Sequence, residues 1–161
     1  MKNILITLFI FSFCVKAANE KFSISPPKQV QEKTLDLFKT VEEHHKIIFY
    51  TLDPSWENKG KFRGWKVLGK SEITDTKTKK LLLTNLYKAI ESNDGFVAGC
   101  FNPRHSLKII SKNKTIDLVI CFECASTNIY SGKQKANFLI NGSPKVFNQI
   151  AKELKLETKK R

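Results

Sequence analysis

The chain has 161 residues, of which 41% are hydrophobic and 27% are charged. This composition is too apolar for a disordered protein, and the length is too short for more than one ordinary domain. The formal net charge is +13, but only three of the 28 basic residues are arginines. Nucleic-acid sites depend on arginine, whereas scattered lysines are typical of a solvated surface. We therefore disfavour a nucleic-acid partner, and the charge leaves an anionic envelope component or another protein as the alternative.

The first 17 residues have the pattern of an export signal. A basic residue precedes the apolar run 4–15, and Ala17 offers a small residue at the cleavage position. The run is shorter than the ~20 residues that a membrane-spanning helix needs. We predict a signal peptide over 1–17 and a soluble mature chain, periplasmic or secreted, without a transmembrane segment. The rival hypothesis is a lipoprotein at Cys14, which Phe13 disfavours because that processing requires a small residue there.

The mature chain divides into an arm, a domain and a tail. We expect an N-terminal arm over 18–27, a single domain over 28–156 and a basic tail over 157–161. Apolar residues at three- and four-residue spacing predict a helix over 28–43. Residues 46–52 are rich in β-branched and aromatic side chains, which predicts a strand.

A polar loop and a second strand follow. Residues 53–64 form the loop, and we expect its aromatic side chains, Trp56 and Phe62, to hold it against the body of the domain. Residues 65–73 alternate between apolar and polar side chains and therefore predict a strand.

Two further helices are predicted from the residues at their ends. Asp75 is expected to cap a helix that runs to about Asn93 and stops at Gly95. Ser143 and Pro144 are expected to start the last helix, as an N-cap followed by proline in the first turn. The apolar stripe of this last helix consists of Val146, Phe147, Ile150, Ala151 and Leu154.

Residues 95–130 have the pattern of three or four short strands joined by tight turns. We predict strands at 96–101, 106–111 and 115–122. If they form a meander, reflection about the second turn places His105 near Cys121. One face of the third strand is predicted to be buried through Ile116, Leu118, Ile120 and Phe122, which leaves Asp117, Val119 and Cys121 on the other.

The expected fold class is α+β. Strands cluster between residues 95 and 140, whereas helices lie outside that block. We expect a mainly antiparallel sheet, with the meander at about 95–130, packed with two or three helices.

The meander is expected to bring five chemically capable side chains towards one end of the sheet. The five, called the candidate cluster below, are Cys100, Arg104, His105, Cys121 and Cys124.

A structural disulfide is the first interpretation of the cysteines. In an exported protein it would most simply join Cys100 to Cys121 or Cys124. A meander places its first and third strands ~9.6 Å apart, which disfavours the Cys100–Cys121 pair. One of the three cysteines must stay free in any case. The cysteines could also be buried as small apolar side chains without a bond.

Zinc binding and thiol redox chemistry are the other two interpretations. Cys100, His105, Cys121 and Cys124 are the ligand types of a tetrahedral zinc site. In an unbroken strand, however, residues three apart lie ~10 Å apart and point to opposite faces. Only a bulge or turn at 122–123 would bring the last two cysteines together. We place redox chemistry after zinc, because no helix begins at the Cys-x-x-Cys sequence.

Several runs of the chain resemble those of a known family. The runs 65–69, 100–105 and 117–124, with Ser143-Pro144, are similar to an uncharacterised family of small exported bacterial proteins. The two cysteine motifs, CFNPRH and DLVICFEC, are the specific part of a resemblance that spans about 46–150. The resemblance implies the fold and the compartment, and it brings no activity with it.

Arg104 and His105 have a structural and a functional interpretation. The pair could bind an anion, with His105 as general base towards a Cys100 thiolate. Alternatively both side chains hold the turn, with Asp117 or Glu123 as the partner of Arg104.

Catalytic signatures are missing from the sequence. It contains no Gly-rich phosphate loop, no Gly-x-Ser-x-Gly and no His-x-x-x-His. We therefore favour a non-enzymatic binding or structural domain of the bacterial envelope, without a cofactor. The alternative is a Cys/His site that binds zinc or performs thiol chemistry.

Overall fold

The computed structural model describes residues 41, 44–55, 60–92, 95, 98–112 and 114–159. The predicted signal peptide, the N-terminal arm and Trp56 lie outside the described residues. The same holds for the predicted helix over 28–43, apart from Val41, which is helical and buried.

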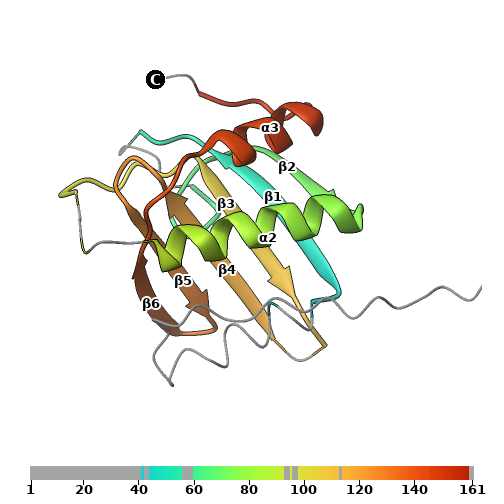
Figure 1. Cartoon of the computed structure of the whole chain (residues 1–161), viewed down its shortest axis with the longest axis horizontal. Coiled ribbons are helices and arrows are strands. Elements are labelled where there is room, and N and C mark those ends of the chain that lie inside the picture. The colour runs from blue at the N-terminus through green and yellow to red at the C-terminus, as the bar shows by residue number, and fades with distance from the viewer. Residues whose placement is uncertain are drawn as a thin grey trace, which may run out of the picture.

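The described part of the chain is an α+β fold, as predicted. A six-stranded sheet has the order β2-β1-β3-β4-β5-β6, and every neighbouring pair is antiparallel. Two helices accompany it (Figure 1). The strands are β1 (Lys46–Leu52), β2 (Val67–Ile73), β3 (His105–Ile110), β4 (Thr115–Cys121), β5 (Ser126–Ser131) and β6 (Gln134–Leu139), and the helices are α2 (Thr76–Glu91) and α3 (Lys145–Glu153). Neither helix is long and apolar enough to cross a membrane in the part of the chain that the structure describes.

The meander begins later in the chain than predicted. It runs from β3 to β6, and the strand predicted at 96–101 is wrong in its described part, because residues 98–101 form no strand. The place beside β3 is taken by β1, with Thr51 opposite His105. Gly99 and Pro103 explain the difference, since glycine weakens a strand and proline cannot donate to a ladder.

Both helices pack on the same face of the sheet. Figure 1 shows α2 crossing this face and α3 lying over one end of it. Asp75 caps α2 as predicted, because its carboxylate accepts the Thr78 N–H at 2.7 Å. The helix ends at Glu91, two residues before the predicted end. Helix α3 begins one residue later than predicted, because Pro144 and not Ser143 is the N-cap; the Ser143 hydroxyl still accepts the Lys145 N–H at 3.2 Å.

The core between the sheet and the helices confirms the alternation predicted for β4. Ile116, Leu118 and Ile120 are buried in this core, and Phe122 packs against it. Phe147 of α3 is fully buried there. The buried face predicted for the strand at 115–122 is therefore confirmed in β4.

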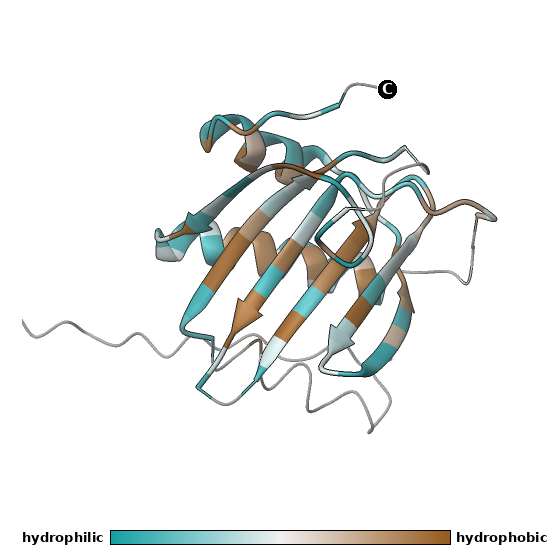
Figure 2. Cartoon of the chain, turned by 180° about the vertical axis from the view of Figure 1, so that it is seen from behind, coloured by the Kyte–Doolittle hydropathy of each residue, from teal (hydrophilic) through white to brown (hydrophobic). Residues whose placement is uncertain are grey.

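The opposite face carries a second, smaller apolar cluster. Phe62 stacks on Tyr50 with ring centroids 4.4 Å apart, so the loop before β2 covers this face as predicted for Phe62. Figure 2 shows the face from behind, with apolar and polar bands alternating along the strands. Asp117 lies here and pairs with Arg63 at 2.7 Å and Lys108 at 3.3 Å.

Candidate functional site

The candidate cluster is divided between the two faces of the sheet. In the β3–β4 ladder His105 lies opposite Ile120, one residue from the predicted partner Cys121. Because side chains alternate along a strand, this shift places His105 and Cys121 at the same end of the sheet but on opposite faces. The imidazole lies instead among aromatic rings, with centroid distances of 6.0 Å to Phe49 and 5.6 Å to Phe147.

Cys121 and Cys124 are brought together by a tight turn at the end of β4. Residues 122–125 fold back, and Cys121 and Cys124 form a disulfide with their Cα atoms 5.2 Å apart. The turn at 122–123 that the sequence required is therefore present. The predicted pairing of Cys100 with one of them is wrong, because this turn brings the two later cysteines within bonding distance of each other. Cys100 stays a free, exposed thiol.

Cys100 nevertheless lies against the disulfide. Its Sγ is 3.0 Å from Cys124 Sγ. Two backbone N–H groups also donate to this group of sulfurs, that of Asn102 to Cys124 Sγ and that of Cys124 to Cys121 Sγ, both at 3.2 Å. Cys121 and Cys124 are buried, so Cys100 is the one of the three described cysteines that is open to a reagent from solution.

This arrangement does not support the zinc alternative. Among the residues that the structure describes, no group of three His, Cys, Asp or Glu side chains is placed to hold a metal ion. His105 faces the helices, whereas Cys121 faces away from them, and two of the three proposed sulfur ligands are bonded to each other. A zinc ligand set needs four donors around one point.

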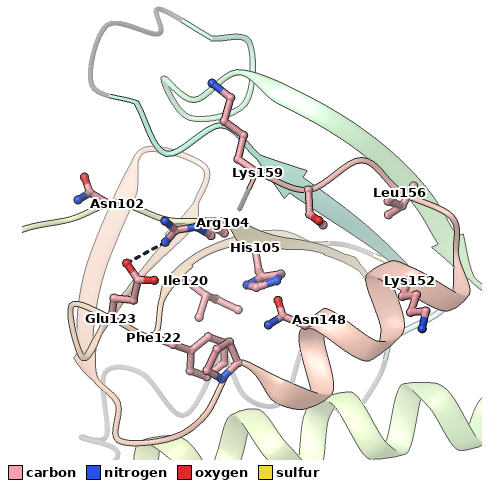
Figure 3. A pocket seen from close by; sticks show the side chains of 12 residues that line it. Asn102, Arg104, His105, Ile120, Phe122, Glu123, Asn148, Lys152, Leu156 and Lys159 are labelled. Carbon is pink, nitrogen blue, oxygen red and sulfur yellow. Dashed lines mark ion pairs between the residues drawn. The ribbon is translucent and has the colours of Figure 1, made fainter. Parts of the chain in front are cut away.

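A cavity of about 430 Å³ lies beside Arg104 and His105, between the end of the sheet, the turn after β4 and α3. Figure 3 shows these side chains together with those that α3 and the following segment contribute. Four lining residues were not predicted as members of this site: Asn102, Asn148, Lys152 and Lys159. Asn148 and Lys152 are four residues apart and so share one face of α3. The spacing predicts that the two side chains lie on one face of the helix. It does not predict that this face meets the candidate cluster, which depends on how α3 packs on the sheet.

The guanidinium of Arg104 has one nitrogen in an ion pair and another without a hydrogen-bond partner among the described residues. Its Nη1 lies 2.8 Å from Glu123 Oε2, so Glu123 is its partner, one of the two that the sequence suggested. Its Nε is buried and has no hydrogen-bond partner among the described residues, and the same is true of Asn102 Oδ1. Both residues line the cavity.

His105 lines the cavity with an imidazole that is buried and uncharged near pH 7. Its pKa is lowered to about 4, chiefly because the ring is buried away from water; a side-chain hydrogen bond with Asn148 raises the pKa in part, and the neighbouring Arg104 charge lowers it. The imidazole is therefore uncharged near pH 7 and serves as a hydrogen-bonding and packing group. Ile120 and Phe122 add apolar surface to the same lining.

Lysines supply further positive charge at the cavity. Lys152 lines it from α3, and Lys159 lines it from the segment after α3. Lys159 Nζ also lies 3.0 Å from Asp53 Oδ2, which ties the C-terminal segment to the end of β1. With Arg104, three cationic side chains surround a cavity whose lining includes one carboxylate, that of Glu123.

No family model, curated protein or solved structure matches the chain. The resemblance to a family of small exported proteins stays a prediction. The fold and the site thus define an α+β protein with a cysteine pair and a basic cavity.

Proposed function

We propose that the chain is an exported, soluble, non-enzymatic binding domain of the bacterial envelope, and that its cavity binds a small organic anion. Export is supported by the apolar run 4–15 and by the Cys121–Cys124 disulfide, which suits an oxidising compartment. The absence of catalytic signatures in the sequence supports a binding role over an enzymatic one.

The observation that carries the proposal is the buried Nε of Arg104, which has no hydrogen-bond partner among the described residues. A buried donor on a charged group loses its water without gaining a partner, which costs more than leaving a neutral donor unpaired. An anionic oxygen in the cavity would accept a hydrogen bond from this N–H and so remove the free-energy cost of the unpaired donor. Charge-assisted hydrogen bonds of this kind are among the stronger polar contacts in proteins.

The other lining residues narrow the chemical class of the ligand. Asn102 Oδ1 is an acceptor without a partner among the described residues, so it suits a ligand that also carries a hydroxyl or amino group. Ile120 and Phe122 suit a short carbon skeleton, and Lys152 suits a second negative charge. The volume of about 430 Å³ lies within the range of small-molecule sites. A hydroxy or amino acid with at least two carboxylates fits all four features.

A thermal-shift panel tests this class on the mature chain, residues 18–161. The probes are malate, citrate, aspartate, succinate, inorganic phosphate and sulfate at equal ionic strength. We expect the hydroxy and amino carboxylates to raise the melting temperature in a saturable manner and succinate to act more weakly. Equal shifts with every anion would show a general salt effect, and the absence of any shift would remove the proposal.

Export has its own test, separate from ligand binding. The full chain is expressed in a bacterial host, and the protein recovered from the periplasm is analysed by mass spectrometry. We expect a chain that begins at Ala18. Retention of residues 1–17 in a cytoplasmic product would contradict export while leaving the binding proposal open to its own test.

A further inference from the structure

The Cys124 sulfur contacts both of the other cysteine sulfurs that the structure describes. Cys124 is bonded to Cys121 on one side and lies 3.0 Å from the free Cys100 Sγ on the other. We propose that these residues form a thiol–disulfide exchange site, in which Cys100 displaces Cys121 from Cys124. This inference rests on the cysteines alone and is independent of the anion cavity.

The exchange is balanced without any further reagent. The Cys100 thiol gives its proton to water, and the thiolate attacks Cys124 Sγ. A Cys100–Cys124 bond forms, the Cys121–Cys124 bond breaks, and its electron pair leaves on Cys121 Sγ, which then takes up a proton. The number of disulfides stays at one, so no oxidant or reductant is consumed.

Two backbone groups favour this step. The Cys124 N–H already donates to Cys121 Sγ at 3.2 Å, and a hydrogen bond to a thiolate stabilises its charged form, which makes Cys121 a better leaving group. The Asn102 N–H donates to Cys124 Sγ at 3.2 Å and so holds residue 102, two positions after the attacking cysteine, against the sulfur under attack.

The product disulfide also has a thermodynamic argument in its favour. Cys121 and Cys124 are separated by three positions, whereas Cys100 and Cys124 are separated by 24. A disulfide that closes a longer loop restricts the unfolded chain more strongly. The two sulfur atoms of this longer loop are already 3.0 Å apart, so the new bond needs no long-range movement of the chain.

The exchange changes which sulfur meets the solvent. In the Cys121–Cys124 isomer the free thiol is the exposed Cys100, and in the Cys100–Cys124 isomer it is Cys121, which is 1% exposed. Cys100 is thus a nucleophile towards an external disulfide in the first isomer. In the second it is the accessible half of a disulfide that an external thiol can attack. The partner class is a thiol or disulfide on a small molecule or protein.

Peptide mapping of the oxidised mature chain tests the exchange. The protein is held at pH 8, quenched with acid, unfolded in guanidinium chloride so that a buried thiol becomes accessible, alkylated with N-ethylmaleimide and digested with trypsin without reduction. Trypsin releases Cys100 in residues 89–104 and the other two cysteines in residues 115–133. We expect the two peptides in part joined by a disulfide with the alkyl group on Cys121. Only separate peptides, with every alkyl group on Cys100, would overturn the proposal.

Two variants refolded with oxidised glutathione sharpen the result. Cys121→Ser should form the Cys100–Cys124 disulfide and lose all reaction with N-ethylmaleimide. Cys124→Ser removes the middle sulfur and should leave Cys100 and Cys121 as two thiols. A Cys121→Ser chain that keeps two free thiols would contradict the exchange site, as would a Cys124→Ser chain that links Cys100 to Cys121 equally well.

Discussion

Arg104 Nη1 lies 2.8 Å from Glu123 Oε2, and this ion pair joins the cavity to the cysteine turn. Arg104 lies directly before β3, and Glu123 lies between the two bonded cysteines. The turn that sets the disulfide therefore also sets the direction in which the guanidinium points.

Replacing Glu123 by Gln should strengthen anion binding. The substitution removes the carboxylate that lines the cavity while keeping the size of the side chain. The pair is partly exposed, so we expect a gain of about 3- to 10-fold in affinity, as for a screened charge near the surface. Calorimetry with malate measures it, and a Glu123→Gln chain that binds malate more weakly than the native chain would show that the carboxylate organises the site.

His105 should make the stability depend on pH between about 4 and 6.5. Its folded pKa of about 4 lies below the ordinary value of 6.5, so the unfolded state binds the proton first as pH falls. The stabilising contribution is complete above pH 6.5 and is lost as pH falls through this window. It amounts to about 3–4 kcal/mol in full, since one pKa unit corresponds to about 1.4 kcal/mol. Urea unfolding at pH 7 and pH 4.5 should show a smaller loss in His105→Leu than in the native chain, and equal losses would contradict the assignment.

Truncating Phe147 should remove much of the stability of the fold. Its ring is fully buried and contacts Phe49, His105 and Phe122 at centroid distances of 6.0, 5.6 and 5.0 Å. We expect Phe147→Ala to cost about 3–5 kcal/mol in urea unfolding. Leu81→Ala is the matched control, because Leu81 is 43% exposed and its loss should change the free energy by less than about 0.5 kcal/mol. Similar costs for the two variants would contradict the packing of α3.

Reduction should destabilise the chain moderately. The Cys121–Cys124 loop is short, and the chain-entropy model gives about 2 kcal/mol for a loop of four residues. Urea unfolding with and without a phosphine reductant measures the difference, and Cys100→Ser serves as the background because it cannot exchange. No change on reduction of Cys100→Ser would mean that this disulfide does not constrain the unfolded state.

Local patterns in the sequence predicted the elements well. The alternation of Ile116, Leu118 and Ile120 identified the buried face of β4, and Asp75 identified the start of α2. These signals are local, because burial and capping act within a few residues. The bounds predicted for the strand at 46–52 are also confirmed.

The site was harder to predict, because it depends on contacts between distant segments. The register of β3 and β4 differs by one residue from the symmetric turn, and this shift alone separates His105 from Cys121. The place of β1 beside β3 is not marked by any local pattern. Lys152 and Lys159 reach the cavity because α3 and the segment after it lie over the end of the sheet.

The most direct test of the binding proposal compares two arginines by calorimetric titration of malate. Both form ion pairs with carboxylates at similar distances, 2.8 Å for Arg104 and 2.7 Å for Arg63, but Arg63 lies on the opposite face of the sheet. We expect Arg104→Gln to lose at least about tenfold in affinity, a cost of about 1.4 kcal/mol or more, with its melting temperature little changed. Arg63→Gln should bind as the native chain does. Equal affinity in the native, Arg104→Gln and Arg63→Gln chains would contradict an anion site at Arg104.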